Sequence, residues 1–451
     1  MPLKRLPSFP FPQTKSRATS RDTTALNSKP FKCAVIGGGP SGYFAAIHVS
    51  EKLEEYGISH EVDILEGTGK TLQKVRISGG GRCNLLPDTE LDLRDNILKC
   101  YPRGERELYG PMMRHKPSEI LDWFNSRGVE TKTEADGRTF PVTDSSQTVI
   151  DCLVSSLTPS ISVHLKTPIT SISKNEDGTY ALQTPSGTST FSSIVFATGS
   201  SRSGYTLLQN LNHTLIPPLP SLFTLNSDLI KTGPFSTLSG VSLPHVLCTF
   251  NSNSSEITTR GPLLFTHVGL SGPCVLKMSS YAARTLHSLK YETTLTLNFV
   301  PGTDSLKLLN EYKTLNPKRK IRGPTPECFK DHSIPKRLWL KLLDNIEIQD
   351  KIYAELSKKD LLKISNVLEE FKLHVKGKNT NKDEFVTCGG VDLKEVNFKN
   401  MESKVQRGCF VVGECLDVDA VTGGYNFLNC WVGGKVAGKG VADYALENYK
   451  G

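Results

Sequence analysis

The chain has 451 residues and a mass of 49.6 kDa, with 37% hydrophobic and 22% charged residues and a formal net charge of +8 at pH 7. This composition is that of an ordinary globular protein of two or three domains, and it excludes disordered, collagenous and coiled-coil classes. Because no stretch of about eighteen or more apolar residues occurs, we expect no membrane-spanning helix.

Most of the excess positive charge lies at the N-terminus. Residues 1–32 contain seven Lys and Arg residues and one acid, Asp22, so the remaining chain is close to neutral. A nearly neutral body has no strong field to attract a polyanion, and nucleic acid is therefore not an expected partner. We interpret the basic run formed by Lys318, Arg319, Lys320 and Arg322 as a solvated loop.

The first 30 residues have the composition of a transit peptide. They are rich in Ser, Thr and Pro and poor in acids, and they lack the apolar core of a secretory signal. We expect them to direct import into a chloroplast or a mitochondrion. The alternative is an untargeted, disordered tail on a cytoplasmic protein, because the amphipathic pattern is weak and five prolines interrupt it.

Residues 31–66 predict a strand, a glycine-rich turn, a helix and a second strand. The first strand is 31–36, the helix covers 43–49, and the second strand, 61–65, ends at Glu66. This is a βαβ unit of the dinucleotide-binding kind, in which an acid at this place accepts hydrogen bonds from the ribose hydroxyl groups. An ordinary exposed glutamate is the alternative for Glu66.

The turn of this unit is Gly37-Gly-Gly-Pro-Ser-Gly42, which contains the spacing GxGxxG. Gly37 permits the tight turn, Gly39 lets the backbone approach a pyrophosphate, and Gly42 lets the helix pack closely on the strand. The pattern alone is weak. The strand before it, the helix after it and the acid at the end of the next strand make it specific.

Two later segments predict further strands of the same sheet. Residues 193–197 lead into Thr198-Gly199, and residues 408–412 lead into Gly413-Glu414. Each apolar segment is closed by glycine, which is typical of strands whose carboxyl ends face a ligand.

The stretch between these strands has a different sequence pattern. Residues 291–300 alternate like a half-buried strand, and Ser357 to Asp360 form a capping-box pattern that begins a helix. The segment Asn251 to Ser255 is the clearest hinge or hairpin loop. We therefore expect an α/β domain in two parts, 31–215 and 377–451, with a β-rich and helical substrate domain inserted over 216–376.

A second glycine-rich segment is Arg76-Ile-Ser-Gly-Gly-Gly-Arg-Cys-Asn84. Close approach of the backbone to a ligand explains this density of glycine. Near the C-terminus, Thr422-Gly-Gly-Tyr-Asn426 precedes a closing helix near 427–437. The positive N-terminal end of that helix is suited to a flavin pyrimidine or a phosphate.

These segments resemble the YhiN/BaiN-type flavoproteins, also described as NAD(P)/FAD-dependent oxidoreductases or aminoacetone oxidase family proteins. The resemblance runs from about Lys32 to Gly440 and does not include residues 1–30. It implies a glutathione-reductase-like Rossmann domain that binds FAD, is discontinuous in sequence and carries an insertion. The matching motifs are Gly37–Gly42, Ile77–Asn84, Leu264–Pro273, Thr387–Val391, Met401–Lys404, Gly413–Glu414 and Thr422–Asn426.

The resemblance also implies which residues contact FAD. Related flavoproteins often have an aspartate where Glu414 stands, so either Glu414 or the nearby Asp417 holds the ribityl chain. For Arg82 the alternative is a turn in which the side chain only closes a salt bridge. The implied cofactor-binding residues are Gly37, Gly39, Ser41, Gly42, Glu66, Gly81, Arg82, Cys83, Asn84, Gly199, Gly413, Glu414 and Asn426.

Two residues are candidates for a catalytic role. His267 lies in a glycine-bounded loop of the insertion and is a candidate proton donor because histidine titrates near neutrality. A structural histidine is the alternative. Arg82 is the candidate cation beside the flavin.

The cysteines indicate neither metal chemistry nor disulfide chemistry. The eleven cysteines include no CxxC pair and no Cys/His cluster, which argues against a zinc site and predicts a reducing compartment. Cys83 has no second thiol near it, since Cys100 is the next, so we interpret Cys83 as a packed residue rather than half of a redox pair.

The expected function is that of an FAD-dependent oxidoreductase that exchanges a hydride between flavin N5 and a small or medium organic substrate. A reductase would take the hydride from NAD(P)H and saturate an activated double bond, whereas an oxidase would oxidise an amine or alcohol with dioxygen. Without a second strand-linked GxGxxG, NAD(P)H would use the substrate site transiently or not at all. The alternative from another class is a non-catalytic flavoprotein that binds RNA or an assembly partner through Lys318–Arg322, Lys372, Lys376, Lys378 and Lys382.

Overall fold

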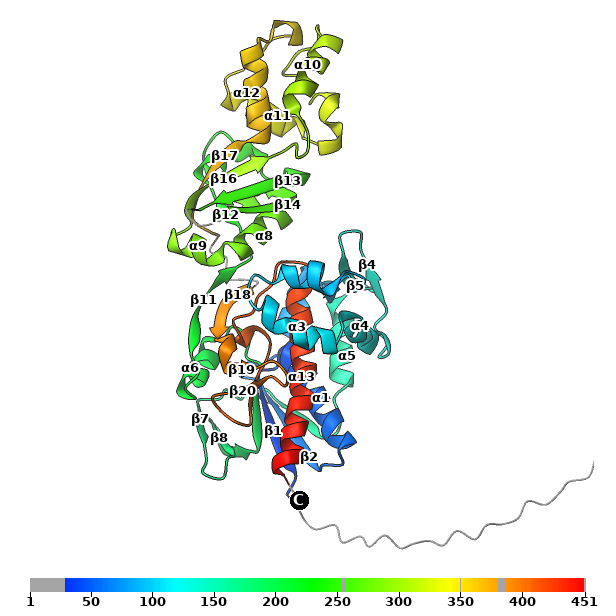
Figure 1. Ribbon diagram of the computed structural model, residues 1–451, viewed down its shortest axis with the longest axis vertical. Helices are drawn as coiled ribbons and strands as arrows, with labels where there is room; N and C mark the ends of the chain where they lie inside the picture. Colours follow the sequence, from blue (N-terminus) through cyan, green and yellow to red (C-terminus); the bar gives the residue numbers. More distant parts are fainter. Residues whose placement is uncertain (1–28, 253–255, 349, 380–385, 450–451) are drawn as a thin grey trace, which may run out of the picture.

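The computed structural model describes residues 29–252, 256–348, 350–379 and 386–449. The chain forms three tiers along its long axis (Figure 1): a nucleotide-binding domain at one end, a β-rich tier in the middle and a helical tier at the far end. The predicted transit segment lies outside the described residues as far as residue 28.

The nucleotide-binding domain is built on a seven-stranded sheet with the strand order β19-β20-β21-β10-β1-β2-β6. The strands from β21 to β6 are parallel, and β20 and β19 add an antiparallel edge. This largely parallel sheet confirms the predicted α/β class, and segments near both ends of the chain contribute strands to it. The strands are β1 (Phe31–Ile36), β2 (His60–Leu65), β6 (Ile161–His164), β10 (Ser193–Phe196), β19 (Val396–Asn397), β20 (Glu402–Ser403) and β21 (Cys409–Val411).

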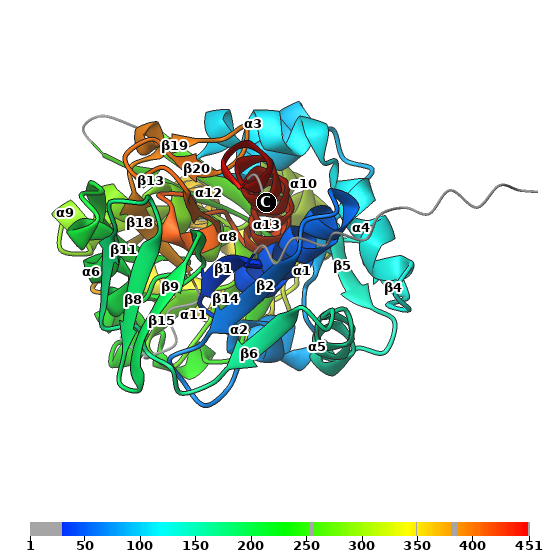
Figure 2. The same ribbon diagram turned by 90° about the horizontal axis from the view of Figure 1, so that it is seen from below.

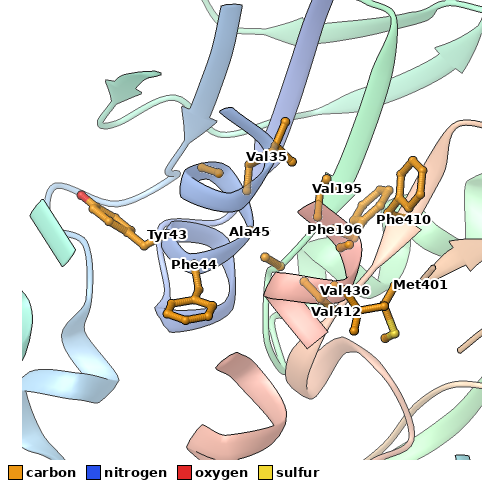
Figure 3. Close-up of a cluster of buried hydrophobic side chains, with 14 of the residues drawn as sticks. Val35, Tyr43, Phe44, Ala45, Val195, Phe196, Met401, Phe410, Val412 and Val436 are labelled. Carbon is orange, nitrogen blue, oxygen red and sulfur yellow. The ribbon is translucent and has the colours of Figure 1, made fainter. Parts of the chain in front are cut away.

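Two helices, α1 (Pro40–Glu55) and α13 (Tyr425–Asn448), lie side by side against this sheet (Figures 1 and 2). Their backbones approach closely because α13 carries glycines at the contact: a Cβ atom on Gly438 would lie 2.5 Å from Cβ of His48. Figure 3 shows the buried side chains beneath them, with Phe44 on α1, Phe196 on β10 and Val436 on α13. This core fixes the N-terminal end of α1 above the strands.

Smaller elements complete the nucleotide-binding domain, and two of its small antiparallel sheets have no counterpart in the sequence prediction. One sheet contains β3 (Leu86–Pro87), β5 (Arg138–Pro141) and β4 (Thr131–Thr133), and the other contains β7 (Ser171–Lys174), β8 (Tyr180–Thr184) and β9 (Gly187–Phe191). The helices are α2 (Gln73–Ile77), α3 (Glu105–Arg114), α4 (Pro117–Asn125), α5 (Ser146–Ser155) and α6 (Arg202–Asn210).

The middle tier is a six-stranded antiparallel sheet in the order β12-β15-β14-β13-β16-β17, and it shares one hydrophobic core with the helical tier. β13 and β14 form a hairpin at the predicted Asn251 to Ser255 loop, of which residues 253–255 lie outside the described residues. The elements are β12 (Leu225–Asn226), α7 (Asp228–Lys231), β13 (Ser242–Asn251), β14 (Glu256–Phe265), β15 (Gly269–Ser271), α8 (Pro273–Tyr281), α9 (Ala283–Ser288), β16 (Glu292–Asn298) and β17 (Phe371–Lys376).

The helical tier contains α10 (Ser305–Leu315), α11 (Lys336–Asn345) and α12 (Lys358–Glu369). The predicted capping box is present at the start of α12, where the Ser357 hydroxyl accepts from the Asp360 N–H and the Asp360 carboxylate accepts from the Ser357 N–H. An antiparallel ribbon of β11 (Leu215–Ser221) and β18 (Val386–Val391) joins the insertion to the nucleotide-binding domain. Among the described helices, none has the length and apolar character needed to cross a membrane.

Candidate functional site

The glycine turn between β1 and α1 has one side packed against protein and one side open. A Cβ atom on Gly37 would lie 2.5 Å from the Ala197 carbonyl oxygen, and one on Gly42 would lie 2.0 Å from the Gly37 carbonyl oxygen. A Cβ atom on Gly39 would meet no described atom within 4 Å. Gly39 is also the N-cap of α1 and has no side chain to satisfy the free N–H groups there. This is the arrangement that an entering phosphate requires.

Glu66 lies directly after β2, beside this turn, and is half-buried. One carboxylate oxygen accepts from the Gly38 N–H at 2.8 Å, and the other accepts from the Thr68 N–H at 2.8 Å. Each oxygen retains a further lone pair. The carboxylate is therefore held in place and can still accept from a ribose hydroxyl group.

The carboxyl ends of β10 and β21 meet the same turn. Gly413 follows β21 and packs on the first turn of α1, where its Cβ atom would lie 2.2 Å from the Ser41 hydroxyl oxygen. Gly199 follows β10, and its Cβ atom would lie 3.6 Å from a Glu414 carboxylate oxygen. The structure thus places five of the predicted residues at one edge of the sheet: Gly39, Ser41, Gly199, Gly413 and Glu414.

Glu414 is the acid at this edge of the sheet. Its carboxylate forms an ion pair with Lys74 and accepts from the Thr387 N–H at 3.0 Å. Asp417 is instead bonded to Arg284 of α9 at 2.6 Å and accepts from the Gly389 N–H at 2.9 Å. Of the two acids that the sequence left open for the ribityl chain, Glu414 lies beside the glycine turn, and Asp417 faces the ribbon and the insertion.

The second glycine-rich segment forms a loop in which Gly79, Gly80 and Gly81 all have positive φ angles, between +57° and +88°. Glycine adopts this conformation without strain. Arg82 then turns to the small β3-β5-β4 sheet, where it pairs with Glu134 at 2.6 Å and Asp144 at 2.7 Å. Its guanidinium lies 4.0 Å from the centroid of the Phe140 ring. These contacts match the salt-bridge alternative for Arg82, and its predicted place beside the flavin stays a prediction.

The two residues after Arg82 differ in character. Cys83 is fully buried, and burial raises the pKa of its thiol to about 12, so it is not a thiolate nucleophile at neutral pH. The side-chain oxygen of Asn84 is buried and has no hydrogen-bond partner among the described residues. An orphaned acceptor beside a glycine loop suits a ligand N–H group, such as those of a flavin pyrimidine.

The side chains of Asn426 and His267 make no described hydrogen bond to the glycine turn. Both ends of the Asn426 amide bond the backbone of Ala420, at 3.0 Å each, so this side chain shapes the loop before α13. His267 lies in the turn between β14 and β15 of the insertion and is exposed. No described hydrogen bond or ion pair joins its side chain to the nucleotide-binding domain, and its role as proton donor stays a prediction.

Sequence reasoning missed the partners that hold the site residues. Lys74 on α2 had no pattern to identify it, and neither had the Thr387 N–H on β18, because both reach Glu414 only through the tertiary fold. The pair of Arg103 with the fully buried Asp419 was missed for the same reason. Within the described ranges, no group of three or more His, Cys, Asp or Glu side chains is placed to hold a metal ion.

Comparison with known proteins identifies relatives over most of the chain. The family described as HI0933-like protein Rossmann domain matches residues 31–440. Ribosomal RNA dihydrouridine synthase of Escherichia coli (strain K12) is 27% identical over 417 residues, which are 89% of this chain and 95% of that protein. The 3-dehydro-bile acid delta(4,6)-reductase of Clostridium scindens is 26% identical over 425 residues, 91% of this chain and 99% of that protein. A flavocytochrome c3 fumarate reductase in an open conformation matches with 13% identity and a TM-score of 0.45, covering 94% of this chain and 80% of that one.

Proposed function

We propose that this protein saturates a carbon–carbon double bond conjugated to a carbonyl group, with NAD(P)H as the reductant. The premise of this proposal is that the chain belongs to the HI0933-like Rossmann-domain family and is an FAD-dependent oxidoreductase. The observation that carries this proposal is the chemistry shared by two relatives that match most of this chain. One is named for making dihydrouridine and the other for reducing a delta(4,6) double bond in a 3-dehydro bile acid. In uridine and in such a steroid the reduced bond is conjugated to a carbonyl group.

The residues of this chain fit FAD. The open space at Gly39 and the N-terminal end of α1 suit the pyrophosphate, Glu66 suits the adenosine ribose, and Glu414 suits the ribityl chain. The unpartnered Asn84 oxygen suits a flavin N–H group. When bound, FAD supplies the hydride chemistry, and the protein supplies orientation and charge.

Saturation of a conjugated double bond also requires a proton at the carbon next to the carbonyl group. His267 is our candidate donor because it lies in the insertion, which is the predicted substrate domain, and because the imidazole of histidine is the commonest general acid in enzymes. Cys83 does not fit this task, since burial raises the pKa of its thiol to about 12 and leaves it no path to a substrate.

NAD(P)H and the substrate are expected to use one site in turn. The described residues contain one strand, glycine turn and helix of the dinucleotide-binding kind, and that unit is the one assigned to FAD. The two substrates should therefore follow ping-pong kinetics, with parallel lines in a double-reciprocal analysis.

The decisive experiment is anaerobic. NADPH should bleach the flavin absorbance of the purified protein, and a conjugated enone, added next without oxygen, should restore it and yield the saturated ketone. An oxidase would behave in the opposite way: an amine or alcohol would bleach the flavin without NADPH, and only dioxygen would restore it. Restoration by oxygen alone, with every conjugated probe inert, would overturn the reductase proposal.

A further inference from the structure

The residues assigned to FAD so far bring more negative than positive charge to the cofactor site. Glu66 and Glu414 both place a carboxylate at the carboxyl edge of the seven-stranded sheet. Each phosphate of the FAD pyrophosphate adds a further negative charge, whereas the N-terminal end of α1 supplies only about half of a positive charge. A cation beside the glycine turn would offset the repulsion among these groups.

Lys74 is the cation that the structure places at this edge. Its ammonium group forms an ion pair with Glu414, while Glu66 has no ion pair among the described residues. Two arginines of nearby loops are engaged elsewhere. Arg82 pairs with acids of the small β3-β5-β4 sheet, and Arg284 pairs with the acid that faces the ribbon.

The backbone before α2 is bonded directly to the glycine turn. The Leu72 N–H donates to the Gly38 carbonyl oxygen at 2.9 Å, and the hydroxyl groups of Thr71 and Tyr43 are bonded at 3.0 Å. A Cβ atom on Gly38 would lie 2.6 Å from the methyl carbon of Thr71. The start of α2 is therefore fixed on the turn that follows β1.

The Lys74 side chain extends from this anchor across the edge of the sheet. Its partner Glu414 follows β21, and β10 lies between β1 and β21 in the sheet order. The Glu414 oxygen that pairs with Lys74 would lie 3.6 Å from a Cβ atom on Gly199, at the end of β10. Lys74 thus connects the glycine turn with the acid assigned to the ribityl chain.

The Cys430 thiol of α13 shows that this ion pair lies close to the first turn of α1. Its sulfur would lie 3.7 Å from a Cβ atom on Gly413, and it is bonded to the Ser41 hydroxyl group. Burial raises the pKa of the thiol to about 12, the bond to Ser41 lowers it, and the charges of Glu414 and Lys74 act on it in opposite directions. The ammonium group is therefore near the free N–H groups that suit the pyrophosphate.

The Lys74 ammonium group has donors left for a ligand. An ammonium group carries several N–H donors and no acceptor. Among the described residues, the Lys74 side chain makes one hydrogen bond, which goes to Glu414. The Lys74 side chain is 47% exposed, whereas the Glu414 side chain is only 17% exposed. The ammonium group thus bonds a held carboxylate on one side and meets open space on the other.

We infer that Lys74 binds the pyrophosphate of FAD while it remains bonded to Glu414. It would then hold the carboxylate in place for the ribityl chain and offset the charge of the phosphates with its remaining donors. Hydrogen bonds between an ammonium group and a phosphate are about twice as strong as those between neutral groups. The inference concerns the cofactor and goes beyond the proposed function, so it is independent of the substrate.

The test measures binding of three ligands to the full-length protein from which FAD has been removed. ADP carries a pyrophosphate without a flavin, riboflavin carries the ribityl chain and the flavin without a phosphate, and FAD carries all of these. The variants are Lys74→Met, which removes the charge, and Lys74→Arg, which keeps it. The control is Lys52→Met, which breaks an exposed pair with Glu55 near the other end of α1.

Isothermal titration calorimetry at low and high salt gives the Kd values. Lys74→Met should raise the Kd for ADP and for FAD by about tenfold or more, because a hydrogen bond between charged groups is lost. The Kd for riboflavin should change much less. The loss of ADP binding should shrink at high salt, since salt screens the ion pair in the wild type. Lys74→Arg should restore most of the affinity, and Lys52→Met should bind all three ligands like the wild type.

Unchanged ADP binding in Lys74→Met would overturn the inference. A larger loss for riboflavin than for ADP would overturn it as well, because Lys74 would then act only on the ribityl chain through Glu414. Equal losses in Lys74→Met and Lys52→Met would show an effect of net charge alone. If the melting temperature shows that Lys74→Met does not fold, Lys74→Gln replaces it in the same comparison, since its amide can still donate to Glu414.

Discussion

At the scale of single residues, the glycines of the first turn serve two different purposes that substitution separates. Gly42 has the Gly37 carbonyl oxygen where a Cβ atom would be, whereas Gly39 borders open space. Gly39→Val should therefore leave the apo protein as stable as the apo wild type but raise the Kd for FAD by at least ~100-fold, or about 2.7 kcal/mol, since the side chain fills the phosphate position. Gly42→Val should lower the melting temperature of the apo protein itself. Equal flavin content in wild type and Gly39→Val would refute this use of Gly39.

The predicted role of His267 is in proton transfer and not in binding FAD. It is exposed on the insertion, so His267→Ala should leave the flavin spectrum and FAD content unchanged. If His267 gives the proton, turnover should fall by about 10²–10⁴-fold in stopped-flow reoxidation of the reduced flavin by substrate, with flavin reduction by NADPH unaffected. Normal reoxidation would make His267 a structural residue of its loop, and the proton would then come from water or another group.

At the scale of elements, the contact of α1 with α13 contains a buried histidine that links stability to pH. Burial lowers the pKa of His48 to about 3, whereas an unfolded histidine titrates near 6.5. Below pH 6.5 the unfolded chain binds a proton that the folded chain does not bind. Proton binding by the unfolded chain therefore lowers the free energy of unfolding. The free energy is at its full value above pH 6.5 and falls as pH decreases towards 3, by about 2 kcal/mol at pH 5. Denaturant unfolding at pH 7 and pH 5 should show that loss in the wild type and a smaller one in His48→Gln.

Two arginines hold the loop after β21 from different sides, and their burial predicts different costs. Arg103 pairs with Asp419, which is fully buried, and donates to the Ser280 carbonyl oxygen of α8. Arg284 of α9 pairs with Asp417 but is 46% exposed. Arg103→Met should lower the free energy of unfolding by about 3–5 kcal/mol, because it leaves a buried carboxylate without its cation. Arg284→Met should cost less, because the Asp417 side chain keeps 11% exposure to solvent and its bond from the Gly389 N–H, and similar costs in denaturant titrations of the two variants would contradict this ranking.

The sequence predicts some elements better than others for physical reasons. The strand 31–36 appears as β1 to the residue, because a buried parallel strand has a nearly continuous apolar pattern. The strand 61–65 appears as β2 with one more residue, because Val62, Ile64 and Leu65 are its buried positions. The closing helix was expected near 427–437, yet α13 continues to Asn448. Its four glycines lower helix propensity, but Gly434, Gly438 and Gly440 meet other backbone or side-chain atoms so closely that no larger residue fits, and tertiary packing outweighs propensity.

The candidate site also contains residues that the sequence predicts and residues that it does not predict. The glycine turn, Glu66, Gly199 and Gly413 were predictable because each follows a strand, and carboxyl ends of parallel strands meet at one edge. The partners of these residues were not predictable. Lys74 meets Glu414 across 340 positions of sequence, and Arg82 meets Asp144 across 62. No local pattern records such contacts, which exist only once the sheet and its helices are in place.

At the scale of the whole molecule, the N-terminal segment differs from the rest of the chain in composition and precedes the first described strand. β1 begins at Phe31, and the family match also begins at residue 31. Residues 1–32 carry seven cationic residues and one acid. We propose that this segment is a transit peptide for a chloroplast or mitochondrion, since basic, acid-poor, Ser-rich segments are recognised by organelle import receptors.

This proposal predicts that the segment acts independently of the enzyme. A fusion of residues 1–40 to a fluorescent reporter should enter an organelle, and the same fusion with Lys4, Arg5, Lys15, Arg17 and Arg21 changed to Gln should remain in the cytosol, because import depends on the positive charge. Removal of residues 1–28 should leave FAD content and the melting temperature of the purified protein unchanged, since every strand and helix described here begins after that point. A diffuse cytosolic signal from the unaltered fusion would contradict targeting, while loss of flavin from the shortened protein would show that the segment belongs to the enzyme.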